Sequence, residues 1–140
     1  MTRQLALLLL GSFLVASTTN AFSDNKGQGG KPLYEDAELV IPDSELPELE
    51  SQALNGSGKA AHHLAMFFGV VRNDSKAQLY WERIAAENGG DPLFMYNYAV
   101  LLNGLPDVDS NERRRIRFWM KKAADAGYGP AKEALANIKE

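Results

Sequence analysis

The sequence predicts an all-α fold built from stacked helix hairpins. Apolar residues recur at helical spacing along most of the chain, and no stretch alternates with period two for long enough to form a strand. A pattern of tryptophan, paired alanines and glycine also occurs twice, at an offset of 38 residues. The length of 140 residues, with 45% hydrophobic and 24% charged residues, fits one folded domain of ordinary size.

Residues 1–21 are predicted to be a secretory signal peptide. The basic residue Arg3 precedes an apolar run over residues 5–16, which is shorter than the roughly 20 residues that span a bilayer. Thr19 and Ala21 then supply small side chains at the spacing that signal peptidases recognise. We therefore expect cleavage near Ala21, a periplasmic or secreted protein, and no membrane anchor after cleavage.

Residues 22–43 are predicted to form a flexible, acidic leader, and residues 44–140 a helical repeat domain. The leader starts glycine-rich and polar, and residues 35–50 contain seven acidic residues and no basic one. Within it, residues 39–41 are expected to pack on the domain as a short extended piece.

Capping residues and apolar periodicity predict the helices of the domain. Ser44 is expected to cap the first helix, and the loop over residues 104–109 to separate two later ones. The remaining helices are predicted over residues 59–70, from Asp74 or Ser75 to Asn88, from Asp91-Pro92 through Leu102, from Ser110 to about Ala126, and after Gly127–Pro130 to near Lys139.

The repeated pattern pairs residues of two helix hairpins. Small alanines allow close approach of helices, and a tryptophan fills the space toward the next hairpin. A weaker third copy contains Ala60, Leu64 and Ala65. In the two stronger copies, Tyr80, Trp81, Ala85, Ala86 and Gly89 match Phe118, Trp119, Ala123, Ala124 and Gly127, and Phe94, Tyr98 and Ala99 match Ala131, Leu135 and Ala136.

The run W-x-x-x-A-A-x-x-G-x-x-x-A-x-x-x-L-A resembles the Sel1-like repeat, a relative of the tetratricopeptide repeat, over residues 53–137. The resemblance implies a right-handed α-solenoid of about two and a half Sel1-like helix-turn-helix repeats, whose concave face binds other proteins. The first copy lacks the tryptophan, and the loop over residues 104–109 lacks the usual second glycine of the family.

Composition excludes several classes of function. The absence of cysteine excludes a disulfide framework, a thiolate zinc site, a cysteine nucleophile and a lipid-anchored bacterial N-terminus. It also separates the chain from the cysteine-rich Sel1-like branch that has been linked to β-lactams. The formal net charge of −3 argues against a nucleic-acid partner, because phosphate binding favours a basic surface.

The sequence offers no pattern for catalysis, so we expect no enzyme, no cofactor and no metal site. The chain has no G-x-S-x-G elbow. Its only histidines, His62 and His63, are adjacent and point about 100° apart on a helix, so they do not share a metal ion easily. One is expected to face the groove and the other the solvent. The alternative function is an envelope enzyme that acts on β-lactams or peptidoglycan.

We predict instead a non-catalytic interaction module that binds a protein partner. An immunity protein against a secreted toxic effector and a general periplasmic adaptor both stay open, as does self-association through the ends of the stack. Exposed aromatic and amide side chains on the concave helices are the predicted contacts. The candidate partner-binding residues are His62, His63, Met95, Tyr96, Asn97 and Asn103.

A basic stripe on one helix is the second candidate surface. Its interpretations are a solvated outer face, docking of the acidic residues 35–50, or capture of an acidic partner. The stripe contains Arg113, Arg114, Arg117 and Lys121.

Overall fold

The computed structural model describes residues 36–137, and all regular secondary structure in this part of the chain is helical, as predicted. The predicted signal peptide, leader residues 22–35 and the end of the last predicted helix lie outside the described residues. Within residues 36–137, each helix is too short or too polar to traverse a lipid bilayer. The elements are η1 (Asp36–Leu39), α1 (Leu46–Leu54), α2 (Gly58–Met66), η2 (Phe67–Val71), α3 (Ser75–Asn88), α4 (Pro92–Asn103), α5 (Ser110–Asp125) and α6 (Gly129–Asn137).

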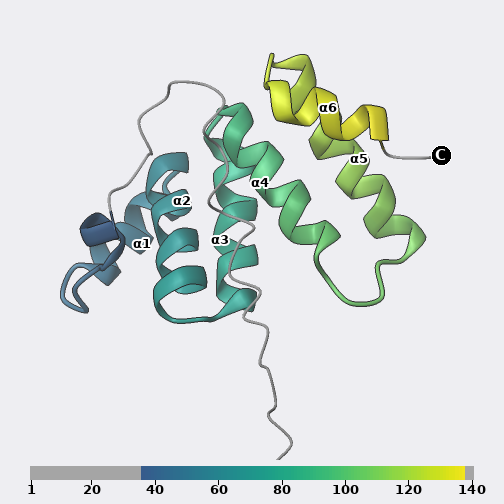
Figure 1. The fold of residues 1–140 in the computed structure, drawn as a ribbon. Helices are drawn as coiled ribbons and strands as arrows, with labels where there is room; N and C mark the ends of the chain where they lie inside the picture. Colours follow the sequence, from purple (N-terminus) through teal and green to yellow (C-terminus); the bar gives the residue numbers. More distant parts are fainter. Residues whose placement is uncertain (1–35, 138–140) are drawn as a thin grey trace, which may run out of the picture. The chain divides into compact units, whose positions relative to one another are not determined.

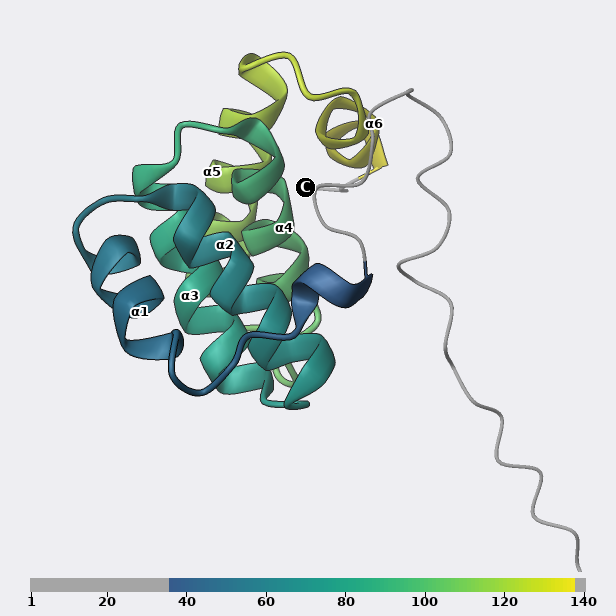
Figure 2. The ribbon, with the colours of Figure 1, turned by 90° about the vertical axis from the view of Figure 1, so that its left-hand side faces the viewer.

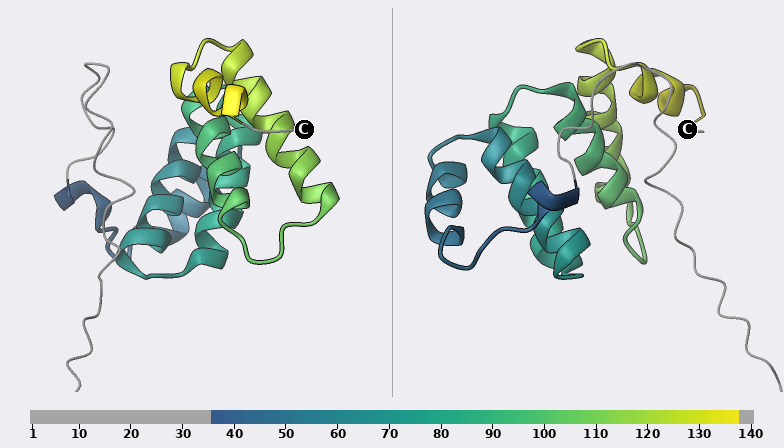
Figure 3. Two further views of the ribbon diagram at one scale, coloured as in Figure 1. Left: turned by 45° about the vertical axis from the view of Figure 1, so that its right-hand side comes forward. Right: turned by 60° about the vertical axis from the view of Figure 1, so that its left-hand side comes forward.

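Consecutive helices pack side by side in chain order, from α1 to α6 (Figure 1). The most extensive contacts join α2 to α3 and α4 to α5, so we refer to these pairs as the first and the second hairpin. Figure 3 shows the connection between α4 and α5 at the end of α5 that lies away from α6.

The repeated sequence pattern marks core positions in both hairpins. Trp81 in α3 and Trp119 in α5 are 7% and 8% exposed, and the matching Ala85 and Ala123 are completely buried. Each tryptophan belongs to a different cluster of buried side chains, one around α1–α3 and one around α4–α6. The pattern therefore predicted correctly that these tryptophans and alanines turn inward, whereas the matched Tyr80 and Phe118 are 45% and 58% exposed.

Two of the predicted helix starts have the expected caps. Asp74 accepts hydrogen bonds from the backbone N–H groups of the first turn of α3, and Asp91 does the same for α4, where proline follows. Between these helices, Gly90 has a φ of 64°, a left-handed conformation that glycine adopts without steric cost.

Two other caps were predicted one residue too early or too late. Ser44 does not cap α1, because Glu45 occupies the N-cap position and its side chain makes no capping hydrogen bond. Ser110 is the first residue of α5, and the cap is Asp109, whose carboxylate accepts from the backbone N–H of Glu112 at 2.8 Å. The Glu112 side chain in turn accepts from the Asp109 N–H, which completes a capping box.

The helix predicted over residues 59–70 is divided in two. The α-helical part ends at Met66, and the π-helical turn η2 follows, in which the Arg72 N–H bonds the Phe67 carbonyl at 3.1 Å. Phe67 is buried, and the Arg72 guanidinium lies 5.2 Å from its ring centroid. Apolar periodicity does not reveal this extra residue, because the two adjacent phenylalanines satisfy either register.

The segment before α1 is held against the first hairpin. Ile41 is 5% exposed and joins the core cluster there, as predicted, whereas Val40 is 59% exposed. The expected extended conformation of residues 39–41 is wrong at Leu39, which is the last residue of the 3₁₀ helix η1. Asp43 forms an ion pair of 2.6 Å with Arg72, the residue directly after η2. Figure 2 shows η1 beside α2, the helix that this segment crosses.

Candidate functional site

His62 is a core residue and does not face a groove or the solvent. It is 3% exposed, and its Nδ1 lies 2.9 and 3.0 Å from the two carboxylate oxygens of Glu82, which is 2% exposed. Its ring also stacks on Phe94, with centroids 4.6 Å apart. The expectation that His62 contacts a partner is therefore corrected: in this conformation its side chain joins α2 to α3 and α4.

His63 is half-buried and contacts the chain's own N-terminal segment. Its Nε2–H donates to the backbone carbonyl of Glu38 across a distance of 2.7 Å. The α2 surface at His63 is thus covered by the N-terminal segment that contains the 3₁₀ helix η1.

The candidate residues on α4 divide between core and surface. Met95 is 6% exposed and packs in the core, so its predicted exposure was wrong. Tyr96 and Asn97 are half-buried and Asn103 is exposed, so a partner could reach all three side chains. Together with Val100, 42% exposed, these three residues lie on one side of the helix by their spacing, and we call them the α4 face.

The α4 face is equivalent to the α2 surface that carries His63. The repeat matches Ala60, Leu64 and Ala65 with Phe94, Tyr98 and Ala99, and all six side chains are buried. Asn97 lies three residues after Phe94, just as His63 lies three residues after Ala60, so the two residues occupy equivalent positions in the repeat. Both side chains offer an N–H donor to a backbone carbonyl.

One edge of the α4 face is aromatic. The Tyr96 ring lies 5.1 Å from the ring of Tyr128, which precedes α6. Aromatic side chains at partly exposed positions supply much of the energy of protein interfaces.

The basic stripe is exposed on α5, and part of it is engaged locally. Arg113 donates to the Val108 carbonyl at 2.9 Å, Arg114 donates to the Asn111 side chain, and Lys121 pairs with Asp125 at 2.6 Å. Arg117 is exposed.

The acidic segment packs elsewhere than on this stripe. Asp43 is paired with Arg72, and the Glu38 carbonyl with His63, so the described contacts of the segment are with η2 and α2. The interpretation that residues 35–50 dock on α5 is not supported by these contacts. The solvated face and the capture of an acidic partner stay open.

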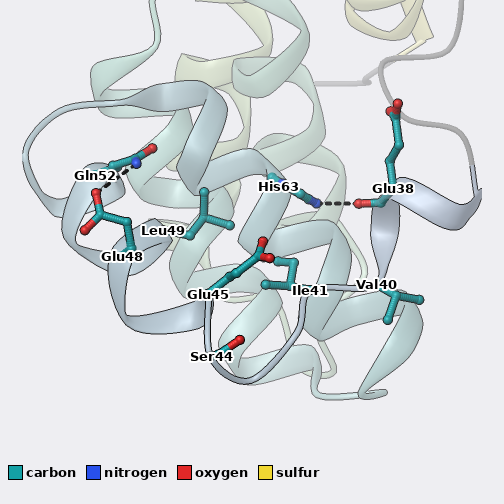
Figure 4. Close-up of a pocket in the computed structure, with 9 residues that line it drawn as sticks. All are labelled: Glu38, Val40, Ile41, Ser44, Glu45, Glu48, Leu49, Gln52 and His63. Carbon is teal, nitrogen blue, oxygen red and sulfur yellow. Dashed lines mark hydrogen bonds between the residues drawn. The ribbon is translucent and has the colours of Figure 1, made fainter.

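A pocket that the sequence did not predict lies between this acidic segment, α1 and α2 (Figure 4). Its volume is about 580 Å³. The acidic composition of residues 35–50 was visible in the sequence, but their folding back over α2 depends on contacts with distant residues. The lining contains Glu38, Val40, Ile41, Ser44, Glu45, Glu48, Leu49, Gln52 and His63.

Among the described residues, the pKa of one titrating group is clearly shifted. The hydrogen bond from the Glu112 backbone N–H lowers the pKa of Asp109 below its ordinary value, and the N–H of Asn111 and the nearby arginines act in the same direction. This group caps a helix, so its shift has a structural cause. Among the described residues, no three His, Asp or Glu side chains gather in a way that could hold a metal ion.

No protein-family model, curated protein or solved structure matches the chain. The Sel1-like resemblance therefore stays a prediction from the sequence.

Proposed function

We propose that this chain is an exported, non-catalytic interaction module, which binds a short segment of a partner protein on the α4 face. In this proposal the helices form a right-handed solenoid of Sel1-like repeats, and α2, α4 and α6 line the binding side. The partner is either a secreted toxic effector, which would make the chain an immunity protein, or a component of the envelope.

The observation that carries this proposal is the contact between α2 and the segment of the same chain that precedes α1. There, an imidazole N–H binds the backbone carbonyl of Glu38 in the 3₁₀ helix η1, and an apolar residue of the same segment, Ile41, enters the core nearby. The equivalent donor on α4 is Asn97, whose side chain forms no hydrogen bond with another residue in the part of the chain that the structure describes.

The surroundings of Asn97 suit the same type of ligand. Val100 offers an exposed apolar side chain one turn away, and Tyr96 offers a half-buried aromatic ring. Recognition of a backbone carbonyl together with an apolar side chain needs little sequence information, so neighbouring contacts must give specificity. Asn103 on the same face and the arginines of α5 are available for that role.

Site-specific photo-crosslinking in the cell of origin tests the proposal. A benzophenone amino acid replaces Val100 on the α4 face, and in a control protein it replaces Phe118, which is 58% exposed on α5. We expect one protein partner to be crosslinked from position 100 and not from position 118. Equal crosslinking from both positions would contradict a binding site on α4.

Substitutions at Asn97 sharpen the test. Asn97→Asp keeps the size of the side chain and removes the N–H donor, so it should abolish the crosslink. Asn97→His copies the donor of the α2 site and should retain it. Turnover of nitrocefin or peptidoglycan by the purified protein, with no partner crosslinked, would overturn the proposal in favour of an envelope enzyme.

A further inference from the structure

The pocket beside α1 combines an apolar floor with an acidic rim. Ile41 and Leu49 provide the floor, and both belong to or pack against the core cluster of the first hairpin. The exposed side chains of Glu45 and Glu48 lie beside them (Figure 4). The pocket volume of about 580 Å³ is sufficient for more than one amino-acid side chain.

Four residues of α1 and its cap present one continuous stripe to the pocket. Glu45, Glu48, Leu49 and Gln52 are spaced as i, i+3, i+4 and i+7, which places their side chains on one face of the helix. Two carboxylates and an apolar group therefore lie close together on a rigid element.

Glu45 is the most distinctive of these residues. It occupies the N-cap of α1 but makes no capping hydrogen bond. Figure 4 shows its side chain directed toward Leu49 and Ile41. Among the described residues, none forms a hydrogen bond or an ion pair with its carboxylate. Glu48 accepts one hydrogen bond, of 3.0 Å, from the neutral Gln52 amide.

Within residues 36–137, the lining contains no lysine or arginine. The basic residue in this part of the lining is His63, whose Nε2–H donates to the Glu38 carbonyl. Arg72, on the same side of the hairpin, is paired with Asp43. The pocket thus has a negative potential that favours a cationic ligand with an apolar stem.

We propose that this pocket binds an arginine side chain in a basic peptide segment of a partner protein. The methylene groups of the arginine pack on Leu49 and Ile41, and its guanidinium lies between the carboxylates of Glu45 and Glu48. Arginine suits the site because its guanidinium is planar, permanently charged and less strongly hydrated than an ammonium group. This site is separate from the α4 face.

Binding of a fluorescein-labelled peptide to the purified protein tests this proposal. The peptide contains arginine residues spaced by glycine, and in the control peptide uncharged citrulline replaces each arginine. We expect the arginine peptide to bind and its affinity to fall between about 0.05 and 0.3 M salt, because the carboxylates are exposed. Equal binding of the citrulline peptide would overturn the proposal.

Charge removal locates the binding site. The double variant E45Q/E48Q should weaken the arginine peptide about tenfold, whereas E87Q, which removes one exposed carboxylate from α3, should leave the affinity nearly unchanged. The thermal midpoint of E45Q/E48Q should stay near that of wild type, because Glu45 caps nothing. An equal loss in E87Q would show that the peptide follows net charge only, and would overturn the proposal.

Two further measurements separate this site from other surfaces. Asn97→Asp should leave arginine-peptide binding unchanged, so the two proposals can fail independently. If the wild-type protein associates with itself in sedimentation experiments, and E45Q/E48Q abolishes this association, then the basic stripe of a second copy occupies the pocket. That outcome would contradict a partner protein as the occupant.

Discussion

The two hairpins share a sequence pattern but differ in what they bury next to the tryptophan. In the first hairpin, the residue after Trp81 is Glu82, which pairs with His62 inside the core. In the second hairpin, the residue after Trp119 is Met120, which is 4% exposed among apolar neighbours. The same backbone pattern thus accommodates either a polar pair or a thioether.

This difference separates two ways of holding one helix on another. A thioether packs in several arrangements, since methionine is unbranched and flexible. A buried carboxylate facing an imidazole needs a defined distance and direction, so it fixes how α2 lies on α3. The polar pair costs desolvation that its hydrogen bonds must offset. We therefore expect it to contribute more to the position of α2 than to net stability.

The largest effect is expected where the hairpins are alike. Trp81→Ala and Trp119→Ala should each lower the free energy of unfolding by about 3–5 kcal/mol, because each removes a large buried side chain. Chemical denaturation measures both values. A large loss of unfolding free energy in one variant and none in the other would show that the two tryptophans are not equivalent. The comparison of the two hairpins would then be invalid.

The next effect distinguishes the hairpins. Glu82→Ala leaves His62 buried without its acceptor and should cost about 3 kcal/mol. The double variant H62L/E82M makes the first hairpin apolar, like the second, and should recover most of that loss in denaturation experiments. If the double variant is as unstable as the single one, the pair is required for stability itself and our interpretation is wrong.

A smaller effect is expected within the first hairpin, where the start of α2 meets the end of α3. A Cβ at Gly58 would lie 2.2 Å from the Gly89 Cα and 2.7 Å from its nitrogen, so Gly58→Ala forces backbone atoms apart. The expected cost of about 1–3 kcal/mol exceeds the gain of about 1 kcal/mol in helix propensity. Gly104→Ala after α4 is the control, since its Cβ would meet the Leu101 carbonyl oxygen at an ordinary 3.5 Å. Equal stability of both variants would argue against the close approach.

The smallest effect concerns the capping box, which α5 of the second hairpin has. The pKa of Asp109 is lower in the folded chain than its ordinary value, chiefly because the Glu112 N–H donates to the carboxylate. The carboxylate therefore stabilises the fold at neutral pH, and this contribution is lost as the pH falls below the ordinary range of aspartate, about 4.

Asp109→Asn checks this pH dependence, because asparagine also caps helices but does not titrate there. Thermal melting at neutral pH should show the variant slightly less stable than wild type. The difference should shrink as the pH is lowered through the acidic range. A difference that does not depend on pH would exclude the charge of Asp109 as its cause.

The sequence predicted the helices better than the contacts between their side chains. Asp91 was identified as a cap, and Asp74 as one of two alternatives with Ser75, because capping is decided within four residues of chain. Asp109 was missed in favour of its neighbour Ser110, since both residue types cap well. At the candidate site, the sequence identified Tyr96, Asn97 and Asn103 as surface residues but placed Met95 with them, although helix spacing puts Met95 on the buried side with Tyr98.

The sequence by itself determined that the chain is helical, where most helices begin and end, and that Trp81 and Trp119 face inward. These properties follow from local periodicity and capping, which act over a few residues. The tertiary structure alone decided which of two adjacent histidines is buried, that Glu82 is its partner, and that an acidic segment closes a pocket over α2. Each of these depends on how helices distant in the chain cross, because their side chains meet only after packing.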